Sequence, residues 1–293
     1  MKIGIYYFSG TGNTELTVKK WKEEANKVGI ECELIKFEDI TEDKIDVSRF
    51  DKIGIGYPIH AFNAPKIILT SAKKVEKLAE PKKCFIVMVS GEYMNLNHSS
   101  SLKLSSILKK KNIFIESEYH YLMPYNMIFR HTEKRAYQMY KTMNELVPLD
   151  VKEYLIENKP HKLNKHKFIR PFIWAIRIEQ PFAPVNGKTY KINKKKCIKC
   201  MKCVNDCPTH NIEYKDGKFK FHGKCLCCTR CSFNCPTNAF SIGLLTSWKV
   251  NGRYKFKEPE VEEKDKHPRY CKKSYIRYYK EAEERLSKSG NNL

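Results

Sequence analysis

The first half of the chain alternates short apolar runs with amphipathic segments. Residues 2–8, KIGIYYF, predict a buried strand, and the amphipathic residues 15–28 predict a helix that ends at Gly29. The same pattern predicts further strands at residues 30–37, 52–57, 83–90 and 112–122, and helical segments near residues 64–79 and 99–111. Because strands and helices alternate, we expect an α/β fold built on a doubly wound parallel sheet of five strands.

A loop rich in glycine and hydroxyl residues, SGTGNT, joins the first strand to the first helix. Its hydroxyl groups, with backbone N–H groups left accessible by two glycines at a helix N-terminus, can surround a terminal phosphate monoester. The loop lacks the Gly-Lys-Ser/Thr of nucleoside triphosphate loops and the third glycine of dinucleotide fingerprints. A glycine-rich turn without a ligand is the alternative. The candidate phosphate contacts are Ser9, Gly10, Thr11, Gly12, Asn13 and Thr14.

The third and fourth predicted strands end in loops that carry aromatic and polar side chains. In a sheet of order 2-1-3-4-5, the switch point lies between the first and third strands, and flavin mononucleotide (FMN) binds at their carboxyl ends. A surface position for His60, a core position for Tyr57 and an exposed loop for Tyr93 are the alternatives. The candidate contacts of a flavin ring are Tyr57, Pro58, Ile59, His60, Ala61, Phe62, Ser90, Gly91, Glu92 and Tyr93.

Two cysteine runs with the spacing C-x2-C-x2-C-x3-C-P follow in the second half. This is the spacing of bacterial two-cluster ferredoxins, in which the fourth cysteine of each run binds the cluster of the other run. It implies one 4Fe-4S cluster held by Cys197, Cys200, Cys203 and Cys235, and a second held by Cys225, Cys228, Cys231 and Cys207. Structural zinc sites are the alternative, but zinc normally takes paired cysteine arms separated by a longer loop.

The residues between and within the cysteine runs support a duplicated unit. Residues 214–221, YKDGKFKF, alternate around Asp216-Gly217, which predicts a β-hairpin. Residues 209–212 and 237–240 are parallel positions after each Cys-Pro, where we expect a short helix and a strand. Cys227 lies between two assigned ligands and is interpreted as a packed thiol.

The loop SGTGNT resembles the phosphate loop of flavodoxins, and the whole chain resembles the flavodoxin–ferredoxin fusion proteins of anaerobic bacteria. The resemblance implies FMN and two 4Fe-4S clusters, with the flavin ring between the loops after the third and fourth strands. These loops lack the tryptophan of many flavodoxins, and residues 123–131, MPYNMIFRH, are expected to lean over the flavin. The implied divisions are a flavodoxin-like FMN-binding domain at residues 1–158, a basic and aromatic linker at 159–186, a small α+β two-cluster ferredoxin domain at 187–245, and a C-terminal extension with a helix at 246–293.

Charge is concentrated in the second half of the chain. Of 293 residues with a formal net charge of +22, residues 159–293 contribute 31 Lys and Arg against 12 Asp and Glu. Such an excess favours an acidic partner or an anionic surface. Nucleic acid is disfavoured because no recognition motif accompanies the basic residues.

The composition also bears on location. Twelve cysteines, most of them in metal-binding spacing, are typical of a reducing compartment. No run of eighteen apolar residues predicts a transmembrane segment, and we expect a cytoplasmic protein.

These features predict an electron-transfer protein without an identifiable catalytic dyad. Electrons would pass between the clusters and FMN, and would be exchanged with an acidic redox protein such as a ferredoxin or flavodoxin, or with a small-molecule acceptor. His60 and Glu92 are candidates for protonating a flavin or substrate. The alternative is a redox-responsive binding protein whose basic half changes its affinity for an acidic partner, a membrane or nucleic acid.

Overall fold

A computed structural model describes residues 1–165, 179–260 and 268–290. Its first part is one parallel sheet of order β2-β1-β3-β4-β5, which confirms the predicted doubly wound topology. The central strands are buried on both faces, as their continuous apolar runs require. The strands are β1 (Lys2–Tyr7), β2 (Glu31–Lys36), β3 (Lys52–Pro58), β4 (Lys82–Ser90) and β5 (Ile113–Leu122).

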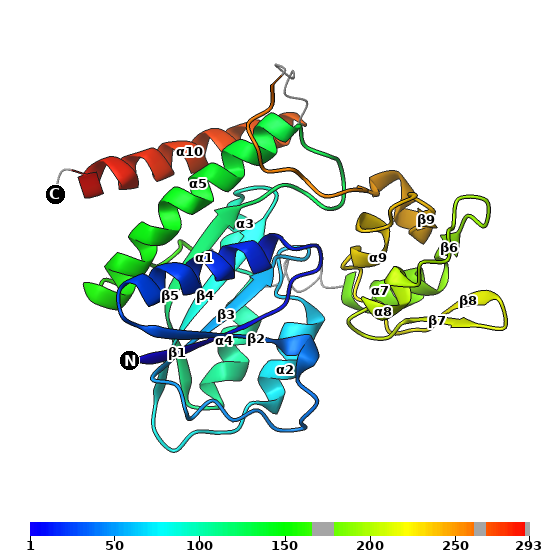
Figure 1. Ribbon diagram of the computed structural model, residues 1–293. Coiled ribbons are helices and arrows are strands. Elements are labelled where there is room, and N and C mark those ends of the chain that lie inside the picture. Colours follow the sequence, from blue (N-terminus) through cyan, green and yellow to red (C-terminus); the bar gives the residue numbers. More distant parts are fainter. Residues whose placement is uncertain (166–178, 261–267, 291–293) are drawn as a thin grey trace.

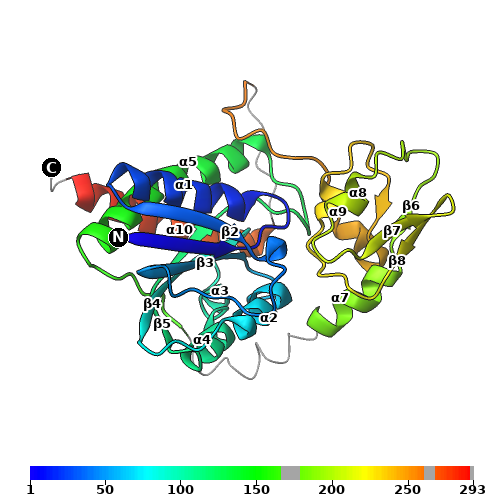
Figure 2. The same cartoon turned by 60° about the horizontal axis from the view of Figure 1, so that its bottom comes forward.

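Helices cover both faces of this sheet (Figures 1 and 2). On one face, α1 and α5 pack together and bury Trp21 and Met143 against the strands. On the other face, α2 and α4 bury Ile68 and Leu104. The helices and turns of this part are α1 (Asn13–Lys27), η1 (Phe37–Asp39), α2 (Lys66–Lys74), α3 (Asn95–His98), α4 (Leu102–Lys109), α5 (Glu133–Val151) and η2 (Lys152–Ile156).

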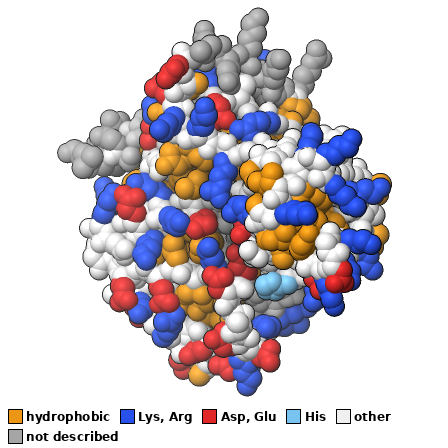
Figure 3. All heavy atoms as spheres, turned by 45° about the vertical axis from the view of Figure 1, so that its right-hand side comes forward, with side chains coloured by type: hydrophobic (Ala, Val, Ile, Leu, Met, Phe, Trp, Pro, Cys, Tyr) orange, Lys and Arg blue, Asp and Glu red, His pale blue; other side chains and the backbone are white. Residues whose placement is uncertain are grey.

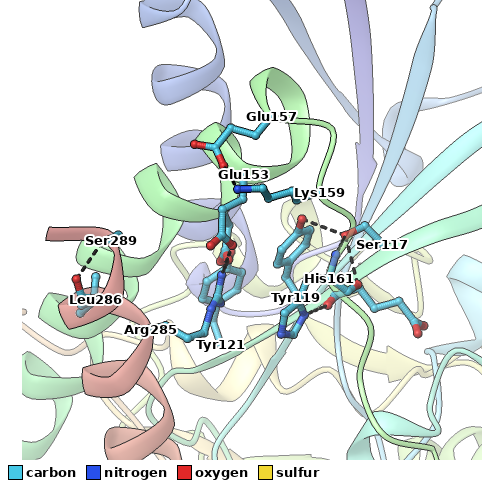
Figure 4. A network of polar contacts seen from close by, with 12 residues as sticks. Ser117, Tyr119, Tyr121, Glu153, Glu157, Lys159, His161, Arg285, Leu286 and Ser289 are labelled. Atoms are coloured by element: carbon cyan, nitrogen blue, oxygen red, sulfur yellow. Dashed lines mark hydrogen bonds and ion pairs between the residues drawn. The ribbon is translucent and has the colours of Figure 1, made fainter. Parts of the chain in front are cut away.

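The C-terminal helix α10 (Arg269–Gly290) returns to the first part of the molecule and packs on α5. Arg285 of α10 donates to Glu153 Oε2 at 2.6 Å (Figure 4). It also donates to Asp150 Oδ1 at 2.6 Å. Asp150 is 1% exposed and also accepts a hydrogen bond from Tyr121, which in turn accepts one from Trp21 at 3.1 Å. Breaking a buried ion pair leaves an uncompensated charge, so these contacts fasten the C-terminus to the sheet and its covering helices.

The second part is small and built around the two cysteine runs. Strands β6 and β9 pair antiparallel, and β7 and β8 form the predicted hairpin. Asp216 and Gly217 both have positive φ, 52° and 72°, as a type I′ turn requires. The elements are α7 (Glu179–Lys188), β6 (Lys191–Ile192), α8 (Lys202–Asn205), β7 (Ile212–Lys215), β8 (Lys218–Phe221), α9 (Arg230–Phe233), β9 (Phe240–Ser241) and η4 (Gly243–Trp248).

The two cysteine runs repeat the same backbone shape. Left-handed residues recur at equal spacing, at Lys199, Met201 and His210 in the first run and at Cys227, Thr229 and Asn238 in the second. The fourth cysteine of each run accepts a backbone N–H bond on sulfur at 3.3 Å, from Asn211 in one case and Ala239 in the other. This correspondence is the structural counterpart of the duplication read from the sequence.

The structure describes only part of the predicted linker. Its apolar residues from Phe168 to residue 178 lie outside the described residues. Within the described ranges, no helix is both long and apolar enough to cross a bilayer.

Candidate functional site

The phosphate-type loop lies at the carboxyl end of β1 and leads into α1. Gly12 has φ 110°, a conformation that side chains rarely adopt, and α1 begins at Asn13. Ser9 Oγ accepts from the backbone N–H groups of Gly12 at 3.1 Å and Glu15 at 3.2 Å, which curls the loop around its own hydroxyl. Thr14 Oγ1 is buried and has no hydrogen-bond partner within the described residues.

That unpartnered hydroxyl is the observation that tests whether a phosphate fits. A buried polar atom without a partner costs free energy, and natural proteins rarely leave one unless a ligand or water satisfies it. The N–H groups of the first helical turn have no acceptor inside the helix, and the helix dipole favours an anion there. The loop therefore suits a phosphate monoester.

A cavity of about 260 Å³ opens beside this loop. Its walls come from the ends of β1, β3 and β4, the segment after β5, and one residue of the second cysteine run. Most of the sequence-predicted contacts line it, namely Ser9, Gly10, Thr11, Asn13, Thr14, Pro58, Ile59, His60, Ala61, Phe62, Ser90, Gly91 and Glu92. Gly12 instead lines an adjoining groove between the two parts of the molecule.

Tyr57 and Tyr93 do not line the cavity. Tyr57 is fully buried among the core residues under α2 and α4, where its hydroxyl lies 3.3 Å from Ser100 Oγ. Side chains alternate across a strand, so Tyr57 faces the core. Tyr93 is 7% exposed and stacks on His120 with ring centroids 5.0 Å apart. The structure therefore does not bring these two tyrosines into the candidate ring site.

The segment after β5 forms one side of the cavity. Asn126 donates to Thr11 Oγ1 at 2.9 Å, and Asn13 donates to the Pro124 carbonyl at 2.7 Å. Met123–Ile128 also supply cavity walls. These bonds tie the segment to the phosphate-type loop, so the two would enclose a bound ligand together.

Helix α10 forms hydrogen bonds with the loop after β4. Tyr275 donates to the Gly91 carbonyl at 2.9 Å, and Arg277 donates to the Tyr93 carbonyl. Ser274 Oγ accepts from the Tyr93 N–H at 3.4 Å. The C-terminal helix thus holds a wall of the cavity, a role that no local sequence pattern indicated.

Two ionisable residues line the cavity with perturbed properties. Burial raises the pKa of Glu92 to about 7, although a hydrogen bond from Asn97 works in the opposite direction. Glu92 Oε2 has no hydrogen-bond partner within the described part of the chain. Burial lowers the pKa of His60 to about 4, so its ring is neutral at pH 7. Glu92 is therefore the group here that can change charge near neutral pH.

The eight predicted cluster ligands fall into two groups. Cys197, Cys200, Cys203 and Cys235 line one pocket, which Cys231 also lines. In the other group, burial and the neighbouring Cys225 and Cys207 raise the pKa of Cys228 to about 12. The fourth cysteine of each run therefore lies with the first three of the other run.

Each group offers four thiols, which is the number of cysteine ligands that one 4Fe-4S cluster takes. Among the described residues, no three His, Cys, Asp or Glu side chains form a group placed to hold one metal ion. Cys227, the additional thiol, is 5% exposed and lies in the wall of the neighbouring cavity, a position that the sequence did not reveal.

The second cysteine run touches the phosphate-type loop directly. A Cβ atom added to Gly10 would lie 2.7 Å from the carbonyl oxygen of Cys228, so only glycine permits this approach. Arg230, two residues further on, donates hydrogen bonds to the carbonyls of Ser9 and Gly10. The second run is therefore next to the cavity.

The beginning of the first cysteine run lies at the surface of the molecule. Cys200 is exposed, and the neighbouring Ile198 is 64% exposed. Lys194, Lys195 and Lys196 are exposed immediately before it. Figure 3 shows an apolar patch on this side of the molecule with basic side chains on and around it. The surface next to this run is therefore basic, with an exposed apolar side chain among its lysines.

Comparison with known proteins bears on both parts. Residues 190–213 match the family model described as a 4Fe-4S binding domain. No curated protein sequence matches the chain. Similar solved structures include a flavodoxin from the domain Archaea (13% identity, 52% of this chain and 99% of that one, TM-score 0.32), oxidised flavodoxin 1 from Bacillus cereus (14%, 50% and 95%, 0.37) and two-electron reduced Megasphaera elsdenii flavodoxin (19%, 41% and 85%, 0.31).

The strand order and the family match together define the architecture. The sheet order β2-β1-β3-β4-β5 is that of the flavodoxin-like fold. The 4Fe-4S binding domain follows it in the same chain. This combination is the one expected of a flavodoxin–ferredoxin fusion.

Proposed function

We propose that this protein is an iron–sulfur flavoprotein that transfers single electrons between two 4Fe-4S clusters and an FMN. One observation carries the proposal: the second cysteine run forms part of the wall of the cavity at the switch point of the sheet. Cys227 lines that cavity, and the Cys228 backbone contacts Gly10 of the phosphate-type loop. An electron donor and an electron acceptor held in direct contact need no further carrier between them.

The flavin site rests on residues of the first part of the chain. Thr14 Oγ1, Ser9 Oγ and those N–H groups at the start of α1 that Ser9 Oγ does not already accept would hold the phosphate. The loops after β3 and β4, together with Met123–Ile128, would enclose the ring and exclude water from it. Tyr57 and Tyr93 are left out of this contact set because both are packed in the core. When bound, the flavin would supply chemistry in steps of one or two electrons.

The cysteines would hold the two clusters in a fixed order relative to the flavin. Cys225, Cys228, Cys231 and Cys207 would form the site next to the cavity, which we call the proximal site. Cys197, Cys200, Cys203 and Cys235 would form the distal site, near the exposed Cys200. We propose that an external electron carrier reaches the distal site first.

The surface around the distal site supports an acidic redox protein as that carrier. Lys194, Lys195, Lys196 and Lys199 are exposed there, and Ile198 supplies an apolar contact in their midst. A protein such as a ferredoxin or flavodoxin with an acidic docking face would be steered to this surface. A small molecule that enters the cavity of about 260 Å³ is a second kind of acceptor.

Rapid anaerobic reduction tests the proposed order. A low-potential one-electron donor is mixed with the protein, and cluster and flavin absorbance are followed separately. In wild type, the flavin should be reduced after the clusters. Cys228→Ala should slow flavin reduction sharply. Cys32→Ala is the control, because it removes a buried core thiol that belongs to neither cysteine run.

The same experiment distinguishes electron transfer from a redox-responsive binding protein. Flavin reduced as fast in Cys228→Ala as in wild type would exclude the proximal site from the path. Turnover of many electrons per chain, delivered to an added acceptor, supports a carrier. A single reduction that changes only the affinity for an acidic partner supports the binding protein instead.

A further inference from the structure

Arg230 occupies the junction between the phosphate-type loop and both cysteine runs. Its Nε donates to the Gly10 carbonyl at 3.0 Å, and its Nη2 donates to the Ser9 carbonyl at 2.7 Å. Its Nη1 donates to the Asp206 carbonyl, in the first cysteine run, at 2.9 Å. Nη2 also contacts both carboxylate oxygens of Glu38, at 2.8 and 3.0 Å. One side chain therefore links three segments that are far apart in the sequence.

This guanidinium group is largely removed from solvent. The Arg230 side chain is 15% exposed and that of Glu38 is 12% exposed. A charge this deeply placed is costly unless its donors are satisfied, and here each nitrogen has an acceptor. The planar fork of arginine reaches these separate acceptors at once, which the point charge of lysine does not. These hydrogen bonds therefore require an arginine at position 230.

The bonds to Ser9 and Gly10 fix the direction of the loop's donors. In a planar trans peptide the carbonyl and the N–H point in opposite directions. Arg230 draws the carbonyls of Ser9 and Gly10 toward itself, so the N–H groups of Gly10 and Thr11 point away from it. Those N–H groups belong to the loop that lines the cavity. Arg230 thus fixes the orientation of two backbone donors of the phosphate-type loop.

The position of Arg230 depends in turn on the second cysteine run. It is the first residue of α9 and lies between Cys228 and Cys231. A loop of ligands rarely keeps its bound shape without its metal, because the binding free energy is also folding free energy. The loop that carries Arg230 would therefore be held less firmly in the absence of the proximal cluster.

We propose that Arg230 couples FMN binding to assembly of the proximal cluster, as a positioning residue that preorganises the phosphate-type loop. This inference rests on the proposed function, because it presupposes both cofactors. Coupling between two binding events is reciprocal. The cluster should therefore tighten FMN binding, and FMN should raise the equilibrium affinity for the cluster by the same factor.

The test measures the dissociation constant of FMN by flavin fluorescence, with the full chain either loaded with iron and sulfide or stripped by an anaerobic chelator. In wild type, stripping should weaken FMN binding by a factor of about 5 to 150, the usual range of such coupling. In Arg230→Met the two dissociation constants should be nearly equal. Arg230→Lys should recover little of the ratio, because it restores the charge without the fork.

Arg253→Met is the matched control. Arg253 is exposed and lines the same groove as Arg230 and Gly12. Its side chain donates to Asn234 Oδ1 at 3.1 Å, and within the described residues it forms no hydrogen bond with the phosphate-type loop. This variant removes one positive charge from the groove and should keep the wild-type ratio.

A second variant guards against loss of the fold in Arg230→Met. Glu38→Gln removes the carboxylate that fixes Nη2 but leaves the cysteine runs untouched, and it should lower the ratio in part. A wild-type ratio in both Arg230→Met and Glu38→Gln would overturn the inference, as would a ratio of one in wild type. Wild-type protein that carries no flavin or no iron would instead overturn the proposed function, so the two failures are distinguishable.

Discussion

Replacing Thr14 by valine should have opposite effects on the flavin-free and flavin-bound protein. The Thr14 side chain is 1% exposed, and Oγ1 has no hydrogen-bond partner in the described ranges. A buried polar group left unsatisfied costs about 1–3 kcal/mol. Valine has the same shape without the hydroxyl, so Thr14→Val should stabilise the flavin-free protein by about 1 kcal/mol.

The same substitution should weaken FMN binding. A hydrogen bond to a charged group contributes about 1.5–3 kcal/mol, which corresponds to a factor of about 10 to 150 in the dissociation constant. Because the flavin-free protein is also stabilised, the loss on binding should reach the upper part of that range. Stability is measured by urea unfolding of the flavin-free protein, and affinity by quenching of FMN fluorescence.

Thr17→Val provides the matched control on the same helix. Thr17 is fully buried, but its hydroxyl donates to the Asn13 carbonyl at 3.1 Å. Its loss should destabilise the protein by about 1 kcal/mol and leave FMN affinity unchanged. If Thr14→Val destabilised the flavin-free protein and left FMN affinity at the wild-type value, the hydroxyl would not be a phosphate contact and the reasoning would be refuted.

Further outcomes concern the clusters, the proton and the docking surface. The double variant Cys207→Ala with Cys225→Ala should lose no more iron than either single variant, because both residues belong to one cluster. Cys207→Ala with Cys235→Ala should instead lose both clusters. Additive iron loss in the first double variant would contradict crossed ligation. As pH rises through the pKa of Glu92, about 7, a negative charge forms beside the flavin and lowers its potential. Glu92→Gln should remove this extra pH dependence in a spectroelectrochemical titration, and an unchanged profile would exclude the role. Neutralising residues 194–196 should slow the reduction of the protein by an acidic ferredoxin. The rate should also depend less on salt, since exposed charges are screened over about 8 Å at physiological salt. A stopped-flow rate that changes neither with salt nor with the substitutions would rule out electrostatic steering.

The elements that the sequence predicted well are those with a local cause. Buried strand runs and the loop from Ser9 to Thr14 follow from periodicity and glycine placement, and the hairpin at Asp216-Gly217 follows from turn chemistry. Helical lengths were less accurate, because the apolar pattern at residues 64–79 continues beyond α2, which ends at Lys74 where Val75 turns to extended backbone. Local signals thus located elements better than their ends.

The parts of the site that escaped prediction depend on long-range packing. The Tyr57 side chain at the end of β3 points into the core and not into the cavity. The alternation of side chains along a strand does not by itself say which face a ligand occupies. Cys227 reaches the cavity only because the two parts of the molecule meet there. Arg230 carries no motif at all, and its bonds to Ser9 and Gly10 span more than two hundred residues.

The central claim is that one chain holds two 4Fe-4S clusters beside one FMN. It is tested most directly by analysing iron, acid-labile sulfide and flavin on the same anaerobically purified sample. The account predicts about eight iron, about eight sulfide and about one FMN per chain, since both cysteine runs are complete. About four iron and about one FMN per chain would contradict it. A dinucleotide in place of FMN would contradict it as well.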